Sequence, residues 1–154
     1  MKRNSGFTLI ELLVVIGILA ILAGVVIVAV NPARQFALTR NTQRQAHVTT
    51  ILNAIGQNMV ENNGNFVCAG GPLPAVATPM TDLTTNPAGY DIAGCIVPNY
   101  VPTLPFDPST GSFTSAATYN TGYTVVQAAV GGRVTISAPG TEIPPGTVIV
   151  SQTR

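Results

Sequence analysis

The stretch GFTLIELLVVI, from Gly6 to Ile16, decides the fold of this chain. It follows two basic residues, Lys2 and Arg3, and it opens an apolar run that reaches Val30. The last 19 residues of that run, which begin at Leu12, carry no charge, hydroxyl or amide group. A helix of that length spans about 28 Å, which is close to the hydrocarbon thickness of a bilayer. The stretch therefore predicts a membrane-spanning helix, to which the rest of the chain is attached.

Two simpler interpretations of this segment leave one residue unexplained. A secretory signal peptide fits the basic start, but the apolar run is longer than usual and no A-x-A-like cleavage site follows it. A plain signal anchor fits the length, and the positive-inside tendency would place the N-terminus in the cytoplasm and the C-terminus outside. Arginines on the far side of the span weaken that bias. Neither interpretation accounts for Glu11, because an acid in a membrane helix costs free energy.

These residues resemble the N-terminal motif of type IV pilins, a family that includes the pseudopilins of secretion systems and competence pili. The motif consists of the basic pair followed by the stretch from Gly6 to Ile16, with an aromatic residue after the glycine and an acid four residues later. The resemblance implies that a prepilin peptidase removes leader residues 1–6 by cutting between Gly6 and Phe7. It also implies that Phe7 is then N-methylated and that the apolar helix stays in the protein.

The resemblance further supplies a partner for Glu11. Cleavage would create an α-amino group at Phe7, which is mostly protonated at neutral pH, one helical turn from the carboxylate. Glu11 can neutralise its own N-terminus or, as the family implies, that of an adjacent subunit during filament assembly. This pairing is stronger in low dielectric than at a surface, and any other register would bury unpaired charges. We therefore assign Glu11 to assembly.

Composition argues against several other functions. Only 8% of the residues are charged and the net charge is +1, so the basic stripe of a nucleic-acid-binding protein is missing and no specific nucleic-acid partner is predicted. The chain has a single histidine, His47, and shows no paired carboxylates, phosphate-binding glycine loop or triad-like spacing. We predict no enzyme, no catalytic residues and no cofactor.

A metal site is not predicted either. The two cysteines do not form a CxxC motif, and His47 is distant from them in sequence. Some pseudopilins bind calcium before the sheet, but the carboxylates available here are chiefly Asp107 and Glu142. Calcium requires six to eight oxygen ligands, so this pair is a poor candidate.

The segment after the membrane span reads as a continuation of the same helix, with an interruption but no stop between them. Pro32 removes a helix hydrogen bond and disfavours helical geometry at Asn31, so we expect a kink or a short melted stretch there. From Ala33 to Glu61 the sequence is compatible with a helix that ends at a left-handed cap on Gly64. One apolar stripe, at spacings of three and four, is expected to pack on a sheet: Val48, Ile51, Leu52, Ile55 and Met59. The polar residues expected on the other faces are Arg40, Asn41, Arg44 and His47. The basic residues among them would lie on a solvated face or, alternatively, contact neighbouring subunits in a filament.

The two cysteines, Cys68 and Cys95, lie in a proline-rich region, residues 65–105, that shows no sustained periodicity. If this part of the chain lies outside the cytoplasm, the two can form one disulfide that staples an ordered loop region. The alternative is a pair of unrelated buried thiols. A short helical turn is possible near residues 81–83.

The C-terminal part predicts an antiparallel sheet of three or four strands. A hairpin joins residues 121–130 to residues 133–138 through Gly131-Gly132, which suits a two-residue primed turn. Further strands are expected at residues 112–119 and 147–151, and residues 107–111 form a turn. The fold class is therefore α+β and pilin-like, with a long N-terminal helix packed on a small sheet.

The expected organisation is a leader at 1–6, a transmembrane and assembly helix at 7–30, its continuation at 31–63, and the rest of the head at 64–154. The expected function is that of a structural subunit of a type IV pilus. Alternatives are a pseudopilin of a type II secretion or DNA-uptake system, or a membrane-tethered binding module that does not polymerise. Expected partners are pilin subunits, the prepilin peptidase and methyltransferase, and the assembly machinery. The precursor would span the inner membrane once, and the filament would lie at the cell surface or in the envelope.

Overall fold

A computed structural model describes residues 6–142 and 150–154 of the chain. The chain divides into two compact units, residues 1–36 and 37–154, and the division falls inside the second helix. The described elements are α1 (Leu9–Val30), α2 (Pro32–Glu61), β1 (Thr78–Thr81), α3 (Ala93–Ile96), β2 (Ser112–Ser115), β3 (Thr118–Gln127), β4 (Val134–Ala138) and β5 (Val150–Thr153). This is the α+β class that the sequence predicts.

Helix α1 is one apolar segment, and none of its residues is buried by the described part of the chain. Its 22 residues have a mean hydropathy of 3.3 over the most apolar window, and every residue from Gly6 to Val30 is exposed. It is the one described helix that is long and apolar enough to cross a membrane. At ~1.5 Å per residue it extends for about 33 Å, which matches a bilayer core.

The expected interruption after α1 is a single residue, Asn31. Its φ of 46° lies in the left-handed region, which asparagine tolerates better than most residues. The same residue begins α2, because its Oδ1 accepts a hydrogen bond from the Arg34 backbone N–H at 3.3 Å. Pro32 then occupies the first helical position, where a backbone N–H would have no partner within the helix, so its absence costs nothing. The chain thus ends one helix and begins the next over two residues, whereas the sequence predicted one continuing helix with a kink or a short melted stretch.

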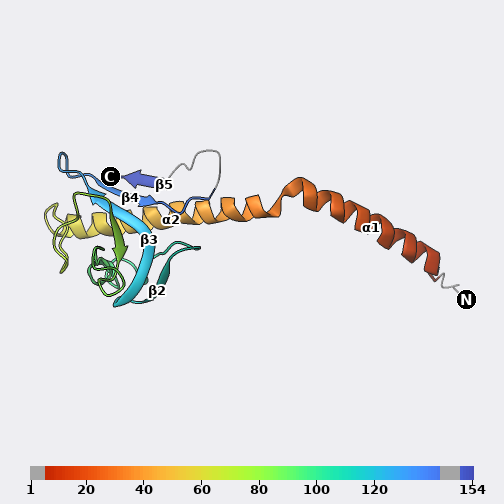
Figure 1. The fold of residues 1–154 in the computed structure, drawn as a ribbon, viewed down its shortest axis with the longest axis horizontal. Helices are drawn as coiled ribbons and strands as arrows, with labels where there is room; N and C mark the ends of the chain where they lie inside the picture. The colour runs from red at the N-terminus through yellow and green to blue at the C-terminus, as the bar shows by residue number, and fades with distance from the viewer. Residues whose placement is uncertain (1–5, 143–149) are drawn as a thin grey trace, which may run out of the picture. The chain divides into compact units, whose positions relative to one another are not determined.

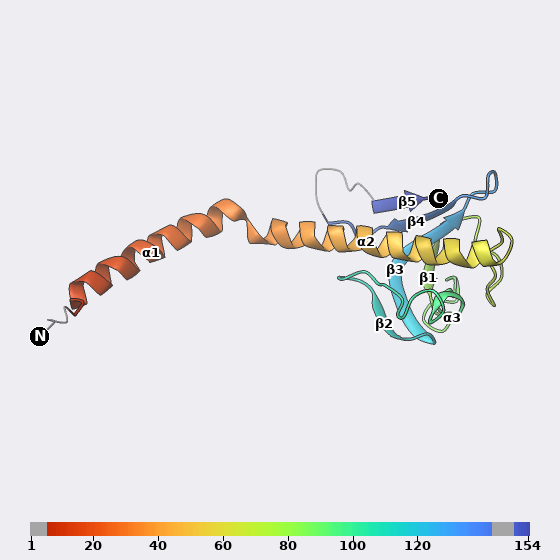
Figure 2. The same ribbon diagram turned by 180° about the vertical axis from the view of Figure 1, so that it is seen from behind.

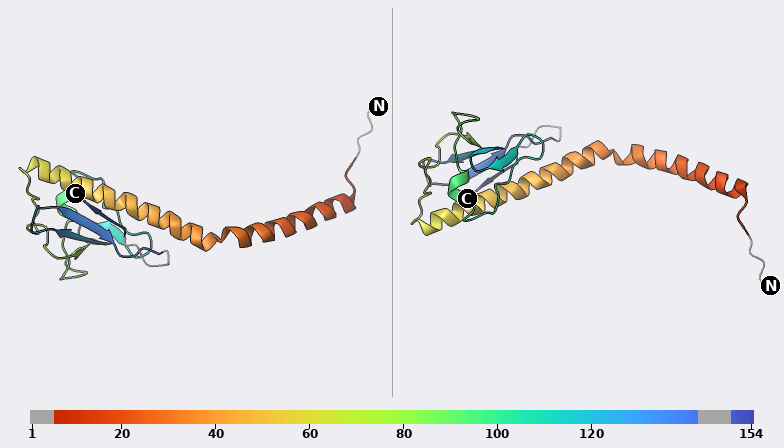
Figure 3. Two further views of the ribbon diagram at one scale, coloured as in Figure 1. Left: turned by 90° about the horizontal axis from the view of Figure 1, so that it is seen from above. Right: turned by 90° about the horizontal axis from the view of Figure 1, so that it is seen from below.

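The second half of α2 covers one face of the sheet (Figures 1 and 3). Its buried apolar residues are Val48, Ile51, Leu52, Ala54 and Ile55, with Met59 partly buried beside them. They pack in one core with residues of the central strands, including Tyr123, Val125 and Ile136. The predicted stripe is therefore confirmed as the helix face that meets the sheet.

The end of α2 agrees with the left-handed cap that the sequence predicts. Asn63 and Gly64 have positive φ values of 56° and 88°, and the Gly64 N–H donates to the Met59 carbonyl at 2.8 Å. The chain then turns back along the helix. There the Asn58 side chain pairs with both backbone groups of Val67, donating at 3.1 Å and accepting at 2.9 Å. This pairing secures the start of the loop region.

The sheet has five strands, one more than expected. Its order is β1-β3-β4-β5, with β2 also paired to β3, and all strand pairs are antiparallel. Figure 2 shows β1 and β2 on one side of α2 and β4 and β5 on the other. The additional strand is β1, which pairs with β3 on the edge opposite to β2 and β4. It is four residues long and contains Pro79. Its sequence carries no alternation that would have indicated a strand. The short turn expected near it follows at Leu83–Thr85.

The hairpin between β3 and β4 is confirmed, but its loop is longer than predicted. Gln127 pairs with Val134, and the Ala128 N–H donates to the Arg133 carbonyl at 2.8 Å, so the loop is Ala129–Gly132. Its last two residues are the glycines, with φ values of 82° and 61°. The expected last strand is observed from Val150, and residues 147–149 lie outside the described residues.

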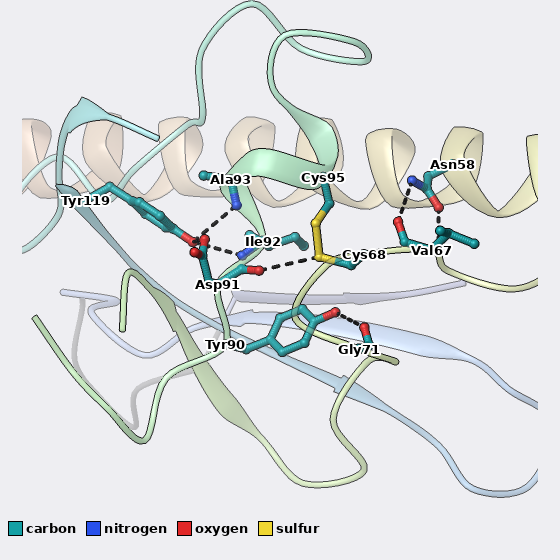
Figure 4. Close-up of a disulfide and its surroundings, with 10 residues drawn as sticks. All are labelled: Asn58, Val67, Cys68, Gly71, Tyr90, Asp91, Ile92, Ala93, Cys95 and Tyr119. Carbon is teal, nitrogen blue, oxygen red and sulfur yellow. Dashed lines mark hydrogen bonds between the residues drawn. A yellow bond between two sulfur atoms is a disulfide. The ribbon is translucent and has the colours of Figure 1, made fainter. Parts of the chain in front are cut away.

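The region between α2 and β2 is ordered by a disulfide and a buried tyrosine (Figure 4). Cys68 and Cys95 are bonded, with their Cα atoms 5.1 Å apart. The Tyr119 hydroxyl accepts hydrogen bonds from the Ile92 and Ala93 N–H groups, at 2.8 Å and 3.2 Å, and it donates to the Asp91 carboxylate at 2.8 Å. One side chain on β3 therefore fixes the start of α3.

We expect Tyr119→Phe to lower the free energy of unfolding by about 1–3 kcal/mol, because the buried N–H groups of Ile92 and Ala93 lose their acceptor. The matched control is Tyr90→Phe, which leaves one carbonyl, that of Gly71, without its donor. Urea unfolding followed by near-ultraviolet circular dichroism measures both. Equal losses in the two variants would contradict the role assigned to Tyr119.

Candidate functional site

The predicted processing and assembly residues lie together at the start of α1. Gly6 and Phe7 precede the helix and are exposed, with 82% of Phe7 accessible to solvent. Thr8 is the N-cap residue, with extended backbone dihedrals. The peptide bond between Gly6 and Phe7 therefore lies outside regular secondary structure, where a peptidase can reach it.

Glu11 and Thr8 form a capping box that the sequence analysis missed. The Glu11 Oε2 atom accepts hydrogen bonds from the Thr8 backbone N–H at 2.8 Å and from the Thr8 hydroxyl at 2.7 Å. In return the Glu11 N–H donates to the Thr8 hydroxyl oxygen at 3.3 Å. The T-x-x-E pattern before an apolar run was the available signal.

The capping box determines where the acid points. Because Oε2 is held by Thr8, the carboxylate is turned back toward the N-terminus rather than along the helix. Its second oxygen, Oε1, makes no hydrogen bond to any residue that the structure describes. The positive end of the helix dipole also stabilises an acid at this position. This arrangement leaves one carboxylate oxygen of Glu11 accessible to a cation near the N-terminal end of α1.

The head contains a buried ion pair, and its arginine is one that the sequence predicted on a solvated face. The side chains of Arg44 and Asp107 are both fully buried, with the Arg44 Nε atom 2.6 Å from Asp107 Oδ2. Arg44 lies four residues before Val48 and so continues the apolar stripe toward the N-terminus. That spacing was the signal for its burial. Neither side chain has surface accessible to solvent, and the carboxylate compensates the charge of the guanidinium.

Three further groups complete the hydrogen bonding of Arg44. Its Nη2 atom donates to the Ser109 hydroxyl at 2.6 Å and to Glu142 Oε1 at 2.9 Å, and its Nη1 atom donates to Asn41 Oδ1 at 2.8 Å. Arg40, whose side chain is partly exposed, pairs with the same Glu142 carboxylate. The predicted solvated face of α2 is therefore wrong for Arg44, and Arg40 and Asn41 take part in the network.

The network shifts the pKa values of its acids. Burial by itself would raise the pKa of Asp107, but Arg44 and the hydrogen bonds from Ser109 and Thr110 hold it well below its usual range. Hydrogen bonds from Arg40 and Arg44 lower the pKa of Glu142 to about 2. Hydrogen bonding to Asp107 raises the pKa of Arg44 further above neutrality. All of these groups are charged at physiological pH.

Glycines let the backbone close around Asp107. A Cβ atom on Gly111 would lie 2.6 Å from the Asp107 nitrogen, one on Gly122 would lie 2.8 Å from the Asp107 Cβ, and one on Gly140 would lie 2.9 Å from Asp107 Oδ2. Gly122 also has a φ of 71°. Side chains at these positions would force the ion pair apart.

Asp107 also fills a gap in the sheet. Strands β2 and β4 pair with the same edge of β3, at Thr118–Asn120 and Thr124–Gln127, and they leave the residues between them unpaired on that edge. The Asp107 N–H donates to the Thr121 carbonyl at 2.7 Å in this gap. The expected turn at residues 107–111 is thus a structural insert between two strands.

The two acids that were considered as calcium ligands and the single histidine all have hydrogen-bond partners within the head. The oxygens of Asp107 and Glu142, the suggested calcium ligands, accept hydrogen bonds from guanidinium groups. No cluster of three or more potential metal-binding side chains occurs in residues 6–142 and 150–154. His47 lies 3.0 Å from the buried Tyr123 hydroxyl, so it too contacts the head rather than only solvent.

Comparison with protein-family models matched residues 1–27 to the prokaryotic N-terminal methylation motif. No curated protein and no solved structure matched the chain. The matched residues include the predicted cleavage position, the capping box and most of α1.

We expect Arg44→Met to lower the free energy of unfolding of the head by about 3–5 kcal/mol at pH 7, because Asp107 is then buried without a counter-charge. The matched control is Arg40→Met, which removes a half-exposed partner of Glu142 and should cost about 1 kcal/mol or less. Urea unfolding measures both.

The pH dependence separates charge from packing. In the unchanged protein, the lowered pKa values of Asp107 and Glu142 give a stabilisation that is present at neutral pH and is lost as pH falls below about 4.5. In Arg44→Met the pKa of Asp107 should instead rise, so the deficit should shrink between pH 7 and pH 3. A constant deficit over this range would show that the loss is one of packing alone.

Proposed function

We propose that this chain, a prepilin of the type IV pilin and pseudopilin kind by its N-terminal motif, is a structural subunit of a type IV pilus or pilus-like filament. The observation that carries the proposal is an exposed apolar helix whose one acid, Glu11, is turned toward its N-terminus by Thr8. A motif of this kind favours a structural subunit over an enzyme.

Processing is the first step of the proposed function. A prepilin peptidase cuts between Gly6 and Phe7 and removes leader residues 1–6. The new α-amine at Phe7 is then methylated, which keeps it basic. The exposed, non-helical backbone at Gly6 and Phe7 supports this order, because the scissile bond lies outside α1 and the capping box lies after it.

Assembly follows from the chemistry that processing creates. The amine of Phe7 supplies a cation for the Oε1 atom of Glu11, which makes no hydrogen bond to a described residue. When the neighbouring subunit donates this amine, two charges are neutralised in low dielectric and a single axial register is favoured. Repeated head-to-tail contacts of this kind do not close into a ring, so a helical filament results.

The same proposal assigns a topology. Helix α1 and the pilin motif suit a membrane-anchored precursor. We place the leader in the cytoplasm and residues 31–154 outside it. The Cys68–Cys95 disulfide supports this orientation, because disulfides persist in oxidising compartments. After assembly the head coats the filament at the surface or in the envelope, and residues 7–30 form its core.

The mature N-terminus tests the proposal directly. We expect mass spectrometry of a sheared surface fraction to find the chain beginning at N-methylated Phe7, without residues 1–6. Abundance in filaments would identify a pilus subunit. A processed chain confined to the envelope would favour a pseudopilin of a type II secretion or DNA-uptake system. A chain that retains residues 1–6 would contradict the proposal and indicate a tethered module that does not polymerise.

The role of Glu11 is tested by two variants. We expect Glu11→Ala to insert in the membrane and to be cleaved normally, but to give at least tenfold fewer filaments, because the N-terminal amine loses its partner. Glu11→Gln preserves the capping geometry with Thr8 and removes only the charge. It should fail in assembly as Glu11→Ala does, as measured in the sheared fraction by immunoblotting.

One outcome and one control separate the charge-pairing role of Glu11 from its capping role. Normal filament yield from Glu11→Gln would reject the charge pairing and leave Glu11 only a capping role. The control for acidic residues in general is Glu61→Gln, which alters an exposed acid of the head and should leave the yield unchanged.

A further inference from the structure

The beginning of α2 belongs to the N-terminal unit rather than to the head. The unit that contains α1 extends to Phe36, so residues 32–36 lie in it although they are part of the second helix. We call these five residues the junction segment. All of them are exposed, and none contributes to the hydrophobic core. Packing of the core therefore does not explain which side chains the junction segment carries.

Two side chains of the junction segment have the chemistry to contact a lipid surface. Phe36 exposes 64% of its surface. Arg34 is exposed too, and none of the three ion pairs among the described residues includes it, whereas Arg40 and Arg44 both have carboxylate partners. An arginine this close to a span, on the side opposite to the leader, also opposes the orientation that the basic leader favours. A contact with lipid would account for both residues.

The junction segment lies at the level of the lipid head groups when α1 spans the bilayer. The head-group layer adds about 5–8 Å on each side of the hydrocarbon core. At ~1.5 Å per residue, Arg34 lies about 6 Å and Phe36 about 9 Å beyond Val30. Side chains on a helix point back toward its N-terminus, which brings the ring of Phe36 closer to the span. Lipid surrounds a helix that crosses this layer, so the two side chains need not share one face.

We propose that the junction segment anchors the precursor to the membrane surface opposite the leader, with the guanidinium of Arg34 bound to lipid phosphates and the ring of Phe36 at the boundary between head groups and acyl chains. Guanidinium groups bind phosphate through two parallel hydrogen bonds, and apolar rings are stabilised at this boundary. Lipid head groups are the occupant because the segment is continuous with α1. The inference rests on the topology in the proposed function, and it adds a defined depth for the precursor.

Depth-dependent fluorescence quenching tests the position of Phe36. The chain contains no tryptophan, so Phe36→Trp introduces a single indole reporter. The full-length chain is placed in nanodiscs of phosphatidylethanolamine and phosphatidylglycerol that carry a nitroxide either on the head group or deep in the acyl chain. We expect the head-group nitroxide to quench the indole at least threefold more than the deep nitroxide does. Aqueous acrylamide should quench it at least threefold less than it quenches an indole in the head.

Two matched variants separate the anchor from the topology on which it rests. Val60→Trp places the indole at an apolar position of α2 that is 83% exposed, where acrylamide should quench it and neither nitroxide should. Leu19→Trp reports on the middle of α1, where the deep nitroxide should quench most. If Leu19→Trp escapes the deep nitroxide, the topology is wrong and the anchor is rejected with it. If it is quenched while Phe36→Trp behaves like Val60→Trp, the topology stands and only the anchor is rejected.

The lipid contact of Arg34 is measured by native mass spectrometry of the chain released from nanodiscs that also contain diacylglycerol, which has the same acyl chains but no phosphate. We expect the unchanged chain to retain phosphatidylglycerol in preference to diacylglycerol. Arg34→Gln should lower that preference about fivefold, the effect of one basic side chain at an anionic membrane surface. The control is Arg133→Gln, an exposed arginine of the head, which should leave the preference unchanged. Lys2 and Arg3 are present in every variant and do not contribute to the difference.

An excess of inorganic phosphate distinguishes a lipid contact from a site for free anions. We expect it to leave the retained phosphatidylglycerol in place, because the acyl chains hold the head group beside Arg34. Displacement of the lipid by phosphate would show a site for free anions and overturn the proposal. The same preference for phosphatidylglycerol in the unchanged chain and in Arg34→Gln would also overturn it.

Discussion

The guanidinium of Arg44 and the carboxylate of Asp107 are buried together, and the arrangement of the head depends on this pair. Arg44 belongs to the helix that covers the sheet, and Asp107 inserts into the sheet between β2 and β4. The pair therefore joins the two layers of the head at one point. Neither charge can stay buried without the other, since an isolated buried ion costs several kcal/mol. Apolar packing is not directional, whereas the ion pair joins α2 to the sheet at one defined position along the helix axis.

The N-terminal unit uses a carboxylate in a different way. Glu11 is held by two donors of Thr8 but has no cationic partner in the described chain, so its charge is oriented and not neutralised. In the head, every acid of the Arg44 network has a guanidinium partner within the same chain. This contrast follows from function as we propose it. A charge that stabilises a fold is satisfied internally, and a charge that directs assembly must remain available to a second subunit. The exposed apolar surface of α1 is available to other subunits in the same way.

The elements that were predicted correctly from sequence depend on local signals. The span of α1 follows from an uninterrupted apolar run, the break at Asn31 from Pro32, and the end of α2 from Gly64. The β3–β4 hairpin follows from two alternating segments around a glycine pair, although its loop has four residues because pairing stops at Ala128. Strand β1 escaped prediction because four residues with a proline carry no periodicity. Its strand conformation comes from hydrogen bonds to β3, which is distant in sequence.

The sequence by itself determined the long apolar helix, the N-terminal methylation motif, the position of Glu11 and the α+β class, because each depends on residues that are close together in the chain. Only the tertiary structure decided that Arg44 is buried, that Asp107 and Glu142 serve as its partners, and that Cys68 and Cys95 are bonded to each other. Those contacts join residues that are 27 to 98 positions apart. A charged side chain looks the same in sequence whether it meets water or a buried counter-charge, and only the folded chain brings that counter-charge into place.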